Sequence, residues 1–402
     1  MLDLLKLAGI LGLIIVLLRF QWNLGLVLIL ASVATGLLFG RAPVDLLFDI
    51  LGAAVEPLTL RLIAIVLLIT FLGEVLRTTL SLEGLVRSLG DLFIDRRWLL
   101  ALMPMLIGML PMVGGAMFSA PMVKEAAQGL DTSPERRTFL NYWFRHSMES
   151  VFPLYPSLVL AAGLMGVTVQ TLTITQFPLF LASLAGGILF GLVGIPRVEP
   201  PGDGRPGRKE TLRLLLKSIW PIALVLGLAI LLGVDLILAL LLTVAVLVAV
   251  HRLGPRRLWK LARRMSWGGA LILVGAMAFR QVLETSGAVE VVSQAFSGLG
   301  VPLPVVVFVV PLLAGLLTGL AAPAFAIGFP IVFPLCGPDV VANGCGMLAY
   351  TGGLVGLLLS PMHLCLALSR DYFGASWGGV YRRMAPAALL LIATAAVVVL
   401  LK

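Results

Sequence analysis

Long runs of apolar residues, separated by short polar segments, make up most of the chain. A transmembrane α-helix needs about 20 consecutive, mostly apolar residues. Ten runs approach or exceed this length, at residues 3–20, 23–40, 57–78, 139–168, 174–195, 212–232, 234–251, 266–286, 342–369 and 384–401. The pattern therefore predicts an all-α polytopic membrane protein with ten transmembrane helices.

Two further apolar stretches, 98–129 and 303–335, are interrupted near their middle by residues that disfavour a helix. The interrupting residues are Pro111, Gly114 and Gly115 in the first stretch and Thr318, Gly319 and Pro323 in the second. Each half then holds about 12–15 residues, too few to cross a hydrocarbon core of about 30 Å at 1.5 Å per residue. We therefore expect two re-entrant helical hairpins, whose tips face protein or a water-filled cavity rather than lipid.

The two interrupted stretches align without a gap when the chain is shifted by 207 residues. The matched pairs include Pro104 with Pro311, Gly108 with Gly315, Phe118 with Phe325 and, after one inserted residue, Pro153 with Pro361 and Gly166 with Gly374. Pro and Gly matches in one register are harder to attribute to apolar composition than Leu and Val matches. The sequence therefore predicts an internal repeat of five spans and one hairpin.

Basic residues are distributed unevenly over the two halves. No Lys or Arg lies between Gln281 and Ser369, whereas the matching part of the first half includes Arg87, Arg96, Arg97, Lys124, Arg136 and Arg137. By the positive-inside rule, the first hairpin opens from the cytoplasm and the second from outside. The two halves are thus predicted to be inverted repeats in the inner (cytoplasmic) membrane. The net charge of +9 is then a consequence of topology, and no nucleic-acid partner is expected.

A short segment dense in Pro and Gly divides the two halves. We predict an N-terminal repeat at 1–196 with the cytoplasmic-side hairpin, a cytoplasmic linker at 197–211, and a C-terminal repeat at 212–402 with the outside-facing hairpin. The linker lacks apolar periodicity, which is typical of a loop.

Composition agrees with a membrane protein. The chain is 60% hydrophobic and 12% charged, whereas soluble domains are about 45–50% apolar and about 25% charged. Cys336, Cys345 and Cys365 form no CxxC pair, so neither a zinc site nor a disulfide framework is indicated. We expect them to be small apolar residues inside helices.

The hairpin tips are candidate binding sites, because inverted-repeat transporters bind substrate and coupling ions where broken helices meet near the middle of the bilayer. Free N–H groups at a helix start attract anions, and free carbonyls at a helix end attract cations. The candidate tip residues are Gly114, Gly115, Ala116, Phe118, Ser119, Thr318, Gly319 and Pro323. The alternative for each tip is a helix kink that only packs against its neighbours.

A second group of candidates lies at the breaks of two predicted spans. They are Arg145, His146, Glu149, Ser150 and Pro153 in the first half and Ser360, Pro361 and His363 in the second. Arg145 and Glu149 are four residues apart, so they share a helix face and form either a surface ion pair or part of a buried site. A metal site at His146 and Glu149 would need a third ligand, and none is apparent, so no metal is expected beyond Na⁺ at the tips and breaks. His363 fits a core histidine, a ligand contact or a proton carrier.

The chain resembles an integral membrane family called domain of unknown function 401, through the motifs Gly114-Gly115-x-x-Phe118-Ser119-x-Pro121 and Trp143-x-Arg145-His146-x-x-Glu149. That family is similar to the ion transporter superfamily, which includes gluconate, citrate, dicarboxylate and lactate permeases. The resemblance implies an elevator mechanism, a homodimer, and Na⁺- or H⁺-coupled transport of a small organic anion without any other cofactor. The chain lacks the Ser-Asn-Thr tips of the dicarboxylate members, which leaves the dicarboxylate substrate and the Na⁺ sites open.

Three other functions are alternatives to a coupled carrier. An inorganic-ion antiporter or exporter of the same fold is the main alternative, because Arg145 is the one strong anion partner at the predicted site. An enzyme is not expected, since the sequence indicates neither a nucleophile–base pair nor a metal triad. A channel would also contain broken hairpins, but the bulky first and last spans favour a scaffold around a moving core.

Overall fold

The computed structural model describes residues 2–79, 95–109, 115–197, 208–265, 267–288, 290–291 and 300–401. These residues are mostly α-helical and contain no strand, which confirms the prediction of an all-α chain. Residues 198–207 of the predicted linker lie outside the described ranges, and the next helix begins at Arg208.

The helices of the first half include two short arms that form the first hairpin, followed by a helix that is broken in its middle. In chain order they are α1 (Leu2–Arg19), α2 (Leu24–Leu38), α3 (Pro43–Val55), α4 (Pro57–Thr79), the hairpin arms α6 (Arg96–Gly108) and α7 (Ala116–Ala126), the broken pair α8 (Pro134–His146) and α9 (Pro156–Met165), then α10 (Val169–Thr175), α11 (Phe177–Gly187) and the π-helical turn η1 (Ile188–Leu192).

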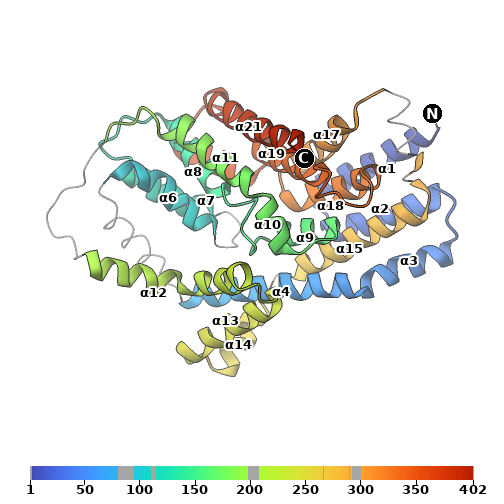
Figure 1. Cartoon of the computed structure of the whole chain (residues 1–402), viewed down its shortest axis with the longest axis horizontal. Helices are drawn as coiled ribbons and strands as arrows, with labels where there is room; N and C mark the ends of the chain where they lie inside the picture. Colours follow the sequence, from blue (N-terminus) through green and yellow to red (C-terminus); the bar gives the residue numbers. More distant parts are fainter. Residues whose placement is uncertain are drawn as a thin grey trace.

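The second half follows a similar order of elements. They are α12 (Arg208–Leu226) with the π-helical turn η2 (Gly227–Leu231), α13 (Leu236–Val250), α14 (Pro255–Ala262), α15 (Trp267–Thr285), the hairpin arms α17 (Leu303–Thr318) and α18 (Ala321–Val332) with the 3-10 turn η3 (Phe333–Leu335), the broken pair α19 (Cys345–Leu359) and α20 (Leu364–Phe373), and α21 (Trp377–Leu400). The order differs in that the single long helix α21 stands where the first half has α10 and α11. Figure 1 shows α11 and α21 along one edge of the molecule and α3, α4 and α12 along the other, with α9, α10 and α18 between them.

Among the residues that the structure describes, three helical segments are long and apolar enough to cross a membrane by themselves: α4, the run Cys345–Phe373 that contains α19 and α20, and α21. The number rises to five if the bent pairs α9–α10 and α14–α15 each count as one span. The predicted spans at 139–168 and 342–369 are broken into α8 with α9 and α19 with α20. Pro153 and Pro361 lie in the breaks, where proline lacks the N–H that a continuous helix requires.

Three short helices, α3, α10 and α14, are absent from the sequence prediction. They contain 13, 7 and 8 residues, so none reaches the length on which spans were identified. Both α3 and α14 begin with a proline at the first helical position, where the missing N–H costs nothing.

The cysteine prediction is wrong in part. Cys336 and Cys345 form a disulfide between η3 and α19, with their Cα atoms 6.2 Å apart. The nine-residue spacing is not a recognised motif, and the pairing depends on the turns through Gly337 and Gly344, both of which have positive φ. Cys365 is a free, buried cysteine on α20, as expected for a small apolar residue in a helix.

Backbone conformations recur between the two halves at a constant spacing. Asn23 caps α2, and Asp235, 212 residues later, caps α13, in each case by accepting a hydrogen bond from the N–H two residues on. At the same spacing, left-handed residues occur in pairs: Gln21 (φ 60°) with Gly233 (φ 65°), and Gly40 (φ 80°) with Arg252 (φ 48°).

The broken helices recur equally closely at a spacing of 208 residues. Helices α9 and α20 each have ten residues and end at a left-handed glycine, Gly166 (φ 69°) and Gly374 (φ 67°). Two residues further on, Thr168 and Ser376 cap the next helix by accepting from the N–H three residues later. Equivalent backbone geometry at these points does not depend on identical side chains.

The hairpins pack in two equivalent ways. Within each half, the first arm lies on the first part of the broken helix, α6 on α8 and α17 on α19. Across the halves, the second arm lies on the second part, α7 on α20 and α18 on α9. A Cβ on Gly108 would collide with the carbonyl oxygen of Arg145, and one on Gly315 would lie 2.7 Å from the carbonyl oxygen of Gly353. The two glycines therefore allow the same close helix contact.

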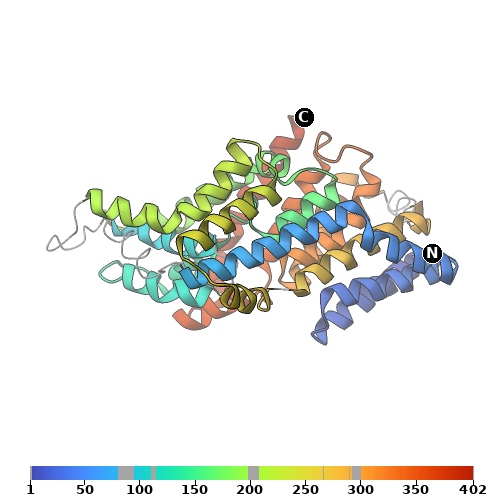
Figure 2. The ribbon, with the colours of Figure 1, turned by 90° about the horizontal axis from the view of Figure 1, so that it is seen from below.

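The remaining helices also pack across the halves, with α2 against α15 and α13 against α4. Figure 2 shows α1 and α2 at one end of the long axis and the hairpin of α6 and α7 at the other. The broken helices α8–α9 and α19–α20 thus lie between both hairpins, and they bring residues from both halves together.

Candidate functional site

Helix α8 positions the first group of candidate residues. Its N-terminus is fixed by Ser133, whose side chain accepts a hydrogen bond from the N–H of Arg136, and by Pro134 at the first helical position. The helix ends at His146, and the chain turns until α9 begins at Pro156. Arg145 and His146 therefore lie at the inner end of a half-helix and are both buried, with 7% of each residue exposed.

Arg145 lies between the two arms of the first hairpin. One of its guanidinium nitrogens donates to the carbonyl oxygen of Ile107 at the end of α6, at 3.2 Å. On the other arm, the guanidinium nitrogens are 2.6 and 2.7 Å from the position that a Cβ on Gly115 would take. Gly115 thus lies beside Arg145, whereas Gly114 lies outside the described residues.

Glu149 is buried in the turn after α8, with 8% exposed. Because α8 has ended at His146, the four-residue spacing no longer places Glu149 on the helix face of Arg145, and the described ion pairs do not include these two residues. Its carboxylate accepts from Ser157 at 3.4 Å, and its backbone carbonyl accepts from the hydroxyl of Tyr350 at 2.7 Å. The surface ion pair considered from the sequence is therefore not formed.

A buried amide connects the first hairpin to both broken helices. The hydroxyl of Ser119 on α7 donates to Asn141 Oδ1 at 2.6 Å, and Asn141 Nδ2 donates to Ser369 Oγ on α20 at 2.8 Å. The same Nδ2 donates to the carbonyl oxygen of Ala116 at 3.1 Å. Asn141 and Ser369, which are fully buried, are site residues that the sequence prediction did not include.

The tip of the second hairpin is held against the break between α19 and α20. Gly319 ends α17 with a φ of 68°, and a Cβ there would lie 2.7 Å from the backbone nitrogen of His363. Ser360 donates to the carbonyl oxygen of Leu316 at 2.6 Å. His363 Nδ1 lies 2.6 Å from the carbonyl oxygen of Gly319, and since a carbonyl only accepts, this nitrogen carries the hydrogen.

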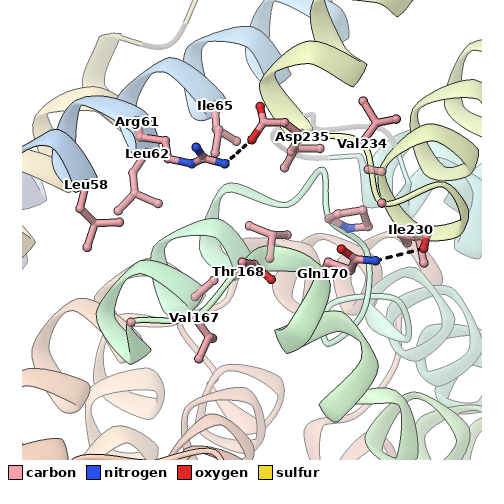
Figure 3. Close-up of a pocket in the computed structure, with 17 residues that line it drawn as sticks. Leu58, Arg61, Leu62, Ile65, Val167, Thr168, Gln170, Ile230, Val234 and Asp235 are labelled. Atoms are coloured by element: carbon pink, nitrogen blue, oxygen red, sulfur yellow. Dashed lines mark hydrogen bonds and ion pairs between the residues drawn. The ribbon is translucent and has the colours of Figure 1, made fainter.

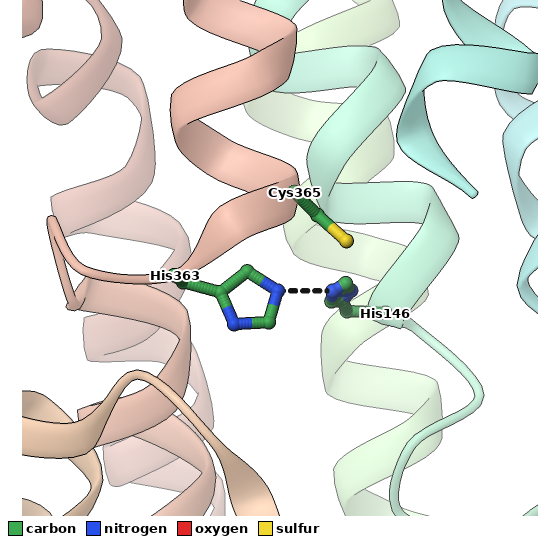
Figure 4. Close-up of side chains that lie close together, drawn as sticks. All are labelled: His146, His363 and Cys365. Carbon is green, nitrogen blue, oxygen red and sulfur yellow. Dashed lines mark hydrogen bonds between the residues drawn. The ribbon is translucent and has the colours of Figure 1, made fainter. Parts of the chain in front are cut away.

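Side chains from the two halves meet at His146, His363 and Cys365 (Figure 4). The two Nε2 atoms are 2.9 Å apart, and the rings meet edge to face. One nitrogen of each histidine and the sulfur of Cys365 all lie within 4.8 Å of one another. The sequence suggested no third ligand near His146, because both of its partners lie more than 200 residues away on α20 and its N-cap.

The other predicted residues lie in varied positions. Ser150 is buried, and its hydroxyl has no hydrogen-bond partner in the described part of the chain. Thr318 donates to Ala314 of its own helix, and Pro323 is buried within α18. Phe118 is 51% exposed, and Pro361 is also exposed, so neither faces the buried cluster.

One cavity is separate from most of these residues. It has a volume of about 540 Å³ and lies between α4, the turn from α9 to α10, and the segment from η2 to α13. Figure 3 shows the ion pair of Arg61 with Asp235 at its edge and the side chain of Gln170 donating to Ile230. Pro153 is the one predicted site residue in its lining. Since most of this lining is apolar, we place the candidate site at the buried polar residues instead.

The chain matches a known protein family along nearly its whole length. No curated protein matches the chain. The family model described as "Protein of unknown function (DUF401)" matches residues 3–401, which is nearly the whole chain. The chain therefore belongs to the DUF401 family.

Proposed function

We propose that this protein is a secondary active transporter of the ion transporter superfamily, which carries a small organic anion across the cytoplasmic membrane. The observation that carries this proposal is the position of Arg145. Its buried guanidinium lies against Gly115 and Ile107 of a hairpin, beside the break that contains Glu149. The planar fork of a guanidinium matches the geometry of a carboxylate.

Inverted repeats are the proposed basis of transport. The recurring caps, left-handed residues and hairpin contacts support two halves of one design. The absence of Lys and Arg between Gln281 and Ser369 supports opposite orientations of the two halves. The disulfide Cys336–Cys345 follows the second hairpin, and disulfides persist outside the cytoplasm, which supports an outside location for the base of that hairpin.

The division of the helices supports an elevator mechanism. The hairpins and broken helices form one packed group that contains Arg145 and Glu149, and α2, α4, α13 and α15 form a second. We propose that the first group moves with its ligand and that the second is the static scaffold. Spans α1, α2, α12 and α13 are proposed to form the contact of a homodimer.

Coupling is proposed to occur at Glu149. An anion that enters would pair with Arg145, and a Na⁺ or H⁺ would neutralise the nearby carboxylate of Glu149, so that the two bind together. Neither charge would then cross the membrane without a partner, which lowers the cost of transfer through a low-dielectric region.

A ligand screen tests the anion site first. The purified protein would be heated in detergent with mono-, di- and tricarboxylates, each with and without Na⁺, because a ligand that binds the folded form raises the melting temperature. At least one carboxylate should do so with the wild type and much less with Arg145→Lys, since lysine lacks the planar fork. Arg137→Lys is the control, because Arg137 lies on the same helix but donates to Thr132 outside the cluster.

Flux measurements test the coupling. In proteoliposomes, the carboxylate identified by the screen should accumulate in a saturable manner when a Na⁺ or pH gradient is applied. Glu149→Gln should retain exchange of bound substrate but lose accumulation. Flux that does not saturate would indicate a channel, and near wild-type accumulation by both Arg145→Lys and Glu149→Gln would rule out the proposed site.

A further inference from the structure

The cluster of His146, His363 and Cys365 has a chemistry that anion transport does not use. All three residues are buried, with 7%, 8% and 7% exposed. In Figure 4, the ring of His363 points from the N-terminus of α20 toward His146, and the sulfur of Cys365 points to the same space. Two imidazoles and a thiol therefore converge from two elements of different halves of the chain.

Hydrogen bonding fixes the tautomer of His363. Because its Nδ1 donates to the carbonyl oxygen of Gly319, the neutral ring presents a lone pair at Nε2, toward His146. A backbone carbonyl that orients a histidine in this way is the usual outer-shell partner of a metal-binding imidazole. The second hairpin tip thus sets the direction of the potential ligand atom.

Hydrogen bonding also sets the tautomer of His146. Because Nε2 of His363 carries a lone pair, Nε2 of His146 is the donor in the contact of 2.9 Å between the two rings. The two Nε2 atoms are therefore directed at each other, and a cation between them would replace this one hydrogen bond.

The ligand atoms are close to the spacing that a tetrahedral cation needs. With Zn–N distances of about 2.0–2.1 Å and a Zn–S distance of about 2.3 Å, ligand atoms lie about 3.3–3.7 Å apart. The two Nε2 atoms, now 2.9 Å apart, would separate by a few tenths of an ångström, and the sulfur, within 4.8 Å, would move by about 1 Å.

We propose that His146 Nε2, His363 Nε2 and Cys365 Sγ bind one transition-metal cation of the Zn²⁺ class. Two imidazoles and one thiolate form a donor set that suits Zn²⁺ and not Na⁺, Mg²⁺ or Ca²⁺, which prefer oxygen ligands. Three protein ligands leave the fourth position open to water or to another ligand.

Proton balance follows from the ligand chemistry. Binding requires the thiolate, so the thiol of Cys365 releases one proton to solution as the metal–sulfur bond forms. His146 remains neutral, because the hydrogen on its Nε2 transfers to Nδ1 when Nε2 becomes a ligand. No oxidation or reduction takes place in this step.

Co²⁺ binding to the full-length protein in detergent tests the site. The wild type should bind one Co²⁺ per chain with a thiolate-to-cobalt charge-transfer band in the near ultraviolet, and Zn²⁺ should displace it. Cys365→Ser should lose the charge-transfer band, and His363→Ala should weaken binding by at least about 10-fold. The disulfide of Cys336 with Cys345 leaves Cys365 as the one free thiol.

His251→Ala is the matched control, because His251 is the third histidine of the chain and lies exposed after α13. It should bind Co²⁺ as the wild type does. The proposal is overturned if the wild type binds no stoichiometric Co²⁺, or if the spectrum persists unchanged in Cys365→Ser. The proposed metal ligands do not include Arg145 or Glu149. Failure of metal binding would therefore leave the proposed anion transport intact, and failure of anion transport would leave the proposed metal site intact.

Discussion

The guanidinium of Arg145 occupies the space that a side chain on Gly115 would need. Gly115 precedes α7 and has ordinary right-handed backbone angles, φ −56° and ψ −18°. The close approach of Arg145, rather than the backbone conformation of Gly115, therefore favours a glycine at this position. The contact joins the first hairpin to the break after α8.

Gly115→Ala should weaken anion binding while the protein still folds. The new methyl group would lie 2.6 Å from a terminal nitrogen of Arg145, and the end of that flexible side chain can move away. A displacement of about 1 Å at a binding group can reduce its effect by about 100-fold, so we expect carboxylate affinity to fall between about 10-fold and about 100-fold. Thermal-shift titration measures this change.

Gly378→Ala is the control for that substitution, because Gly378 is helical and a Cβ there would contact nothing within 4 Å. It should bind the carboxylate as the wild type does. Wild-type affinity in Gly115→Ala would show that the guanidinium does not need its present position.

Gly319→Ala should destabilise the second hairpin tip far more than Gly374→Ala destabilises the end of α20. Both glycines end a helix with nearly equal φ, 68° and 67°, so both substitutions share a left-handed backbone cost of about 1–2 kcal/mol. Only at Gly319 would the methyl group also press on the backbone of His363 and Met362, at 2.7 and 2.8 Å. Melting temperatures in detergent compare the two variants, and equal losses would contradict this assignment.

Much of this architecture could be predicted from the sequence, because apolar length and helix-breaking residues are local signals. The hairpin arms, the break at Pro153 and the break at Pro361 all follow from such signals. The residue-by-residue correspondence of the first helices was not predicted, since Gln21 corresponds to Gly233 and Gly40 to Arg252. The backbone conformation recurs there while the residue type does not.

The candidate site was predicted less completely. Arg145, His146 and Glu149 could be selected because polar residues in an apolar span are costly. Cys365 and Asn141 could not, since their partners lie on other elements: His146 for Cys365, and Ser119 and Ser369 for Asn141. A continuous helix was also assumed in pairing Arg145 with Glu149, and the end of α8 at His146 removes that relationship.

Asn141→Ala should destabilise the protein by about 1–3 kcal/mol, because it leaves the buried hydroxyls of Ser119 and Ser369 without their amide partner. Thr138→Val on the same helix is the control. The hydroxyl of Thr138 donates only within α8, to Pro134, so its loss should cost less than about 1 kcal/mol. Thermal unfolding in detergent tests the difference, and similar melting temperatures for both variants would argue against a structural role of the amide.

Stability should decrease in acid because of Glu135, which lies at the start of α8 outside the membrane-spanning segments. A hydrogen bond from its own backbone N–H, together with those from the backbone and hydroxyl of Ser376, lowers the pKa of Glu135. A lowered pKa in the folded state means that the stabilisation is present above the unfolded pKa of about 4.3 and is lost as pH falls through the folded value.

The measurement is the melting temperature of wild type and Glu135→Gln across this acidic range. The variant should be less stable than the wild type near neutral pH. The difference between the two melting temperatures should become smaller as the solution becomes acidic. The effect should be small, because Glu135 is only partly buried. A difference in melting temperature that increases in acid would mean that the ionised carboxylate of Glu135 does not stabilise the folded state.

Opposite orientation of the two hairpins can be measured with single cysteines at their bases. Asp131 follows the second arm of the first hairpin, and Val301 precedes the first arm of the second; both are exposed. The native cysteines should not react with the reagent, because Cys336 and Cys345 are bonded to each other and Cys365 is buried.

In intact cells, an impermeant thiol reagent should label Val301→Cys from outside, and Asp131→Cys only after the membrane is opened. The positive-inside argument predicts this difference, since arginine and lysine flank only the first hairpin. Labelling of both positions from the same side would falsify the inverted repeat and, with it, the elevator mechanism built on it.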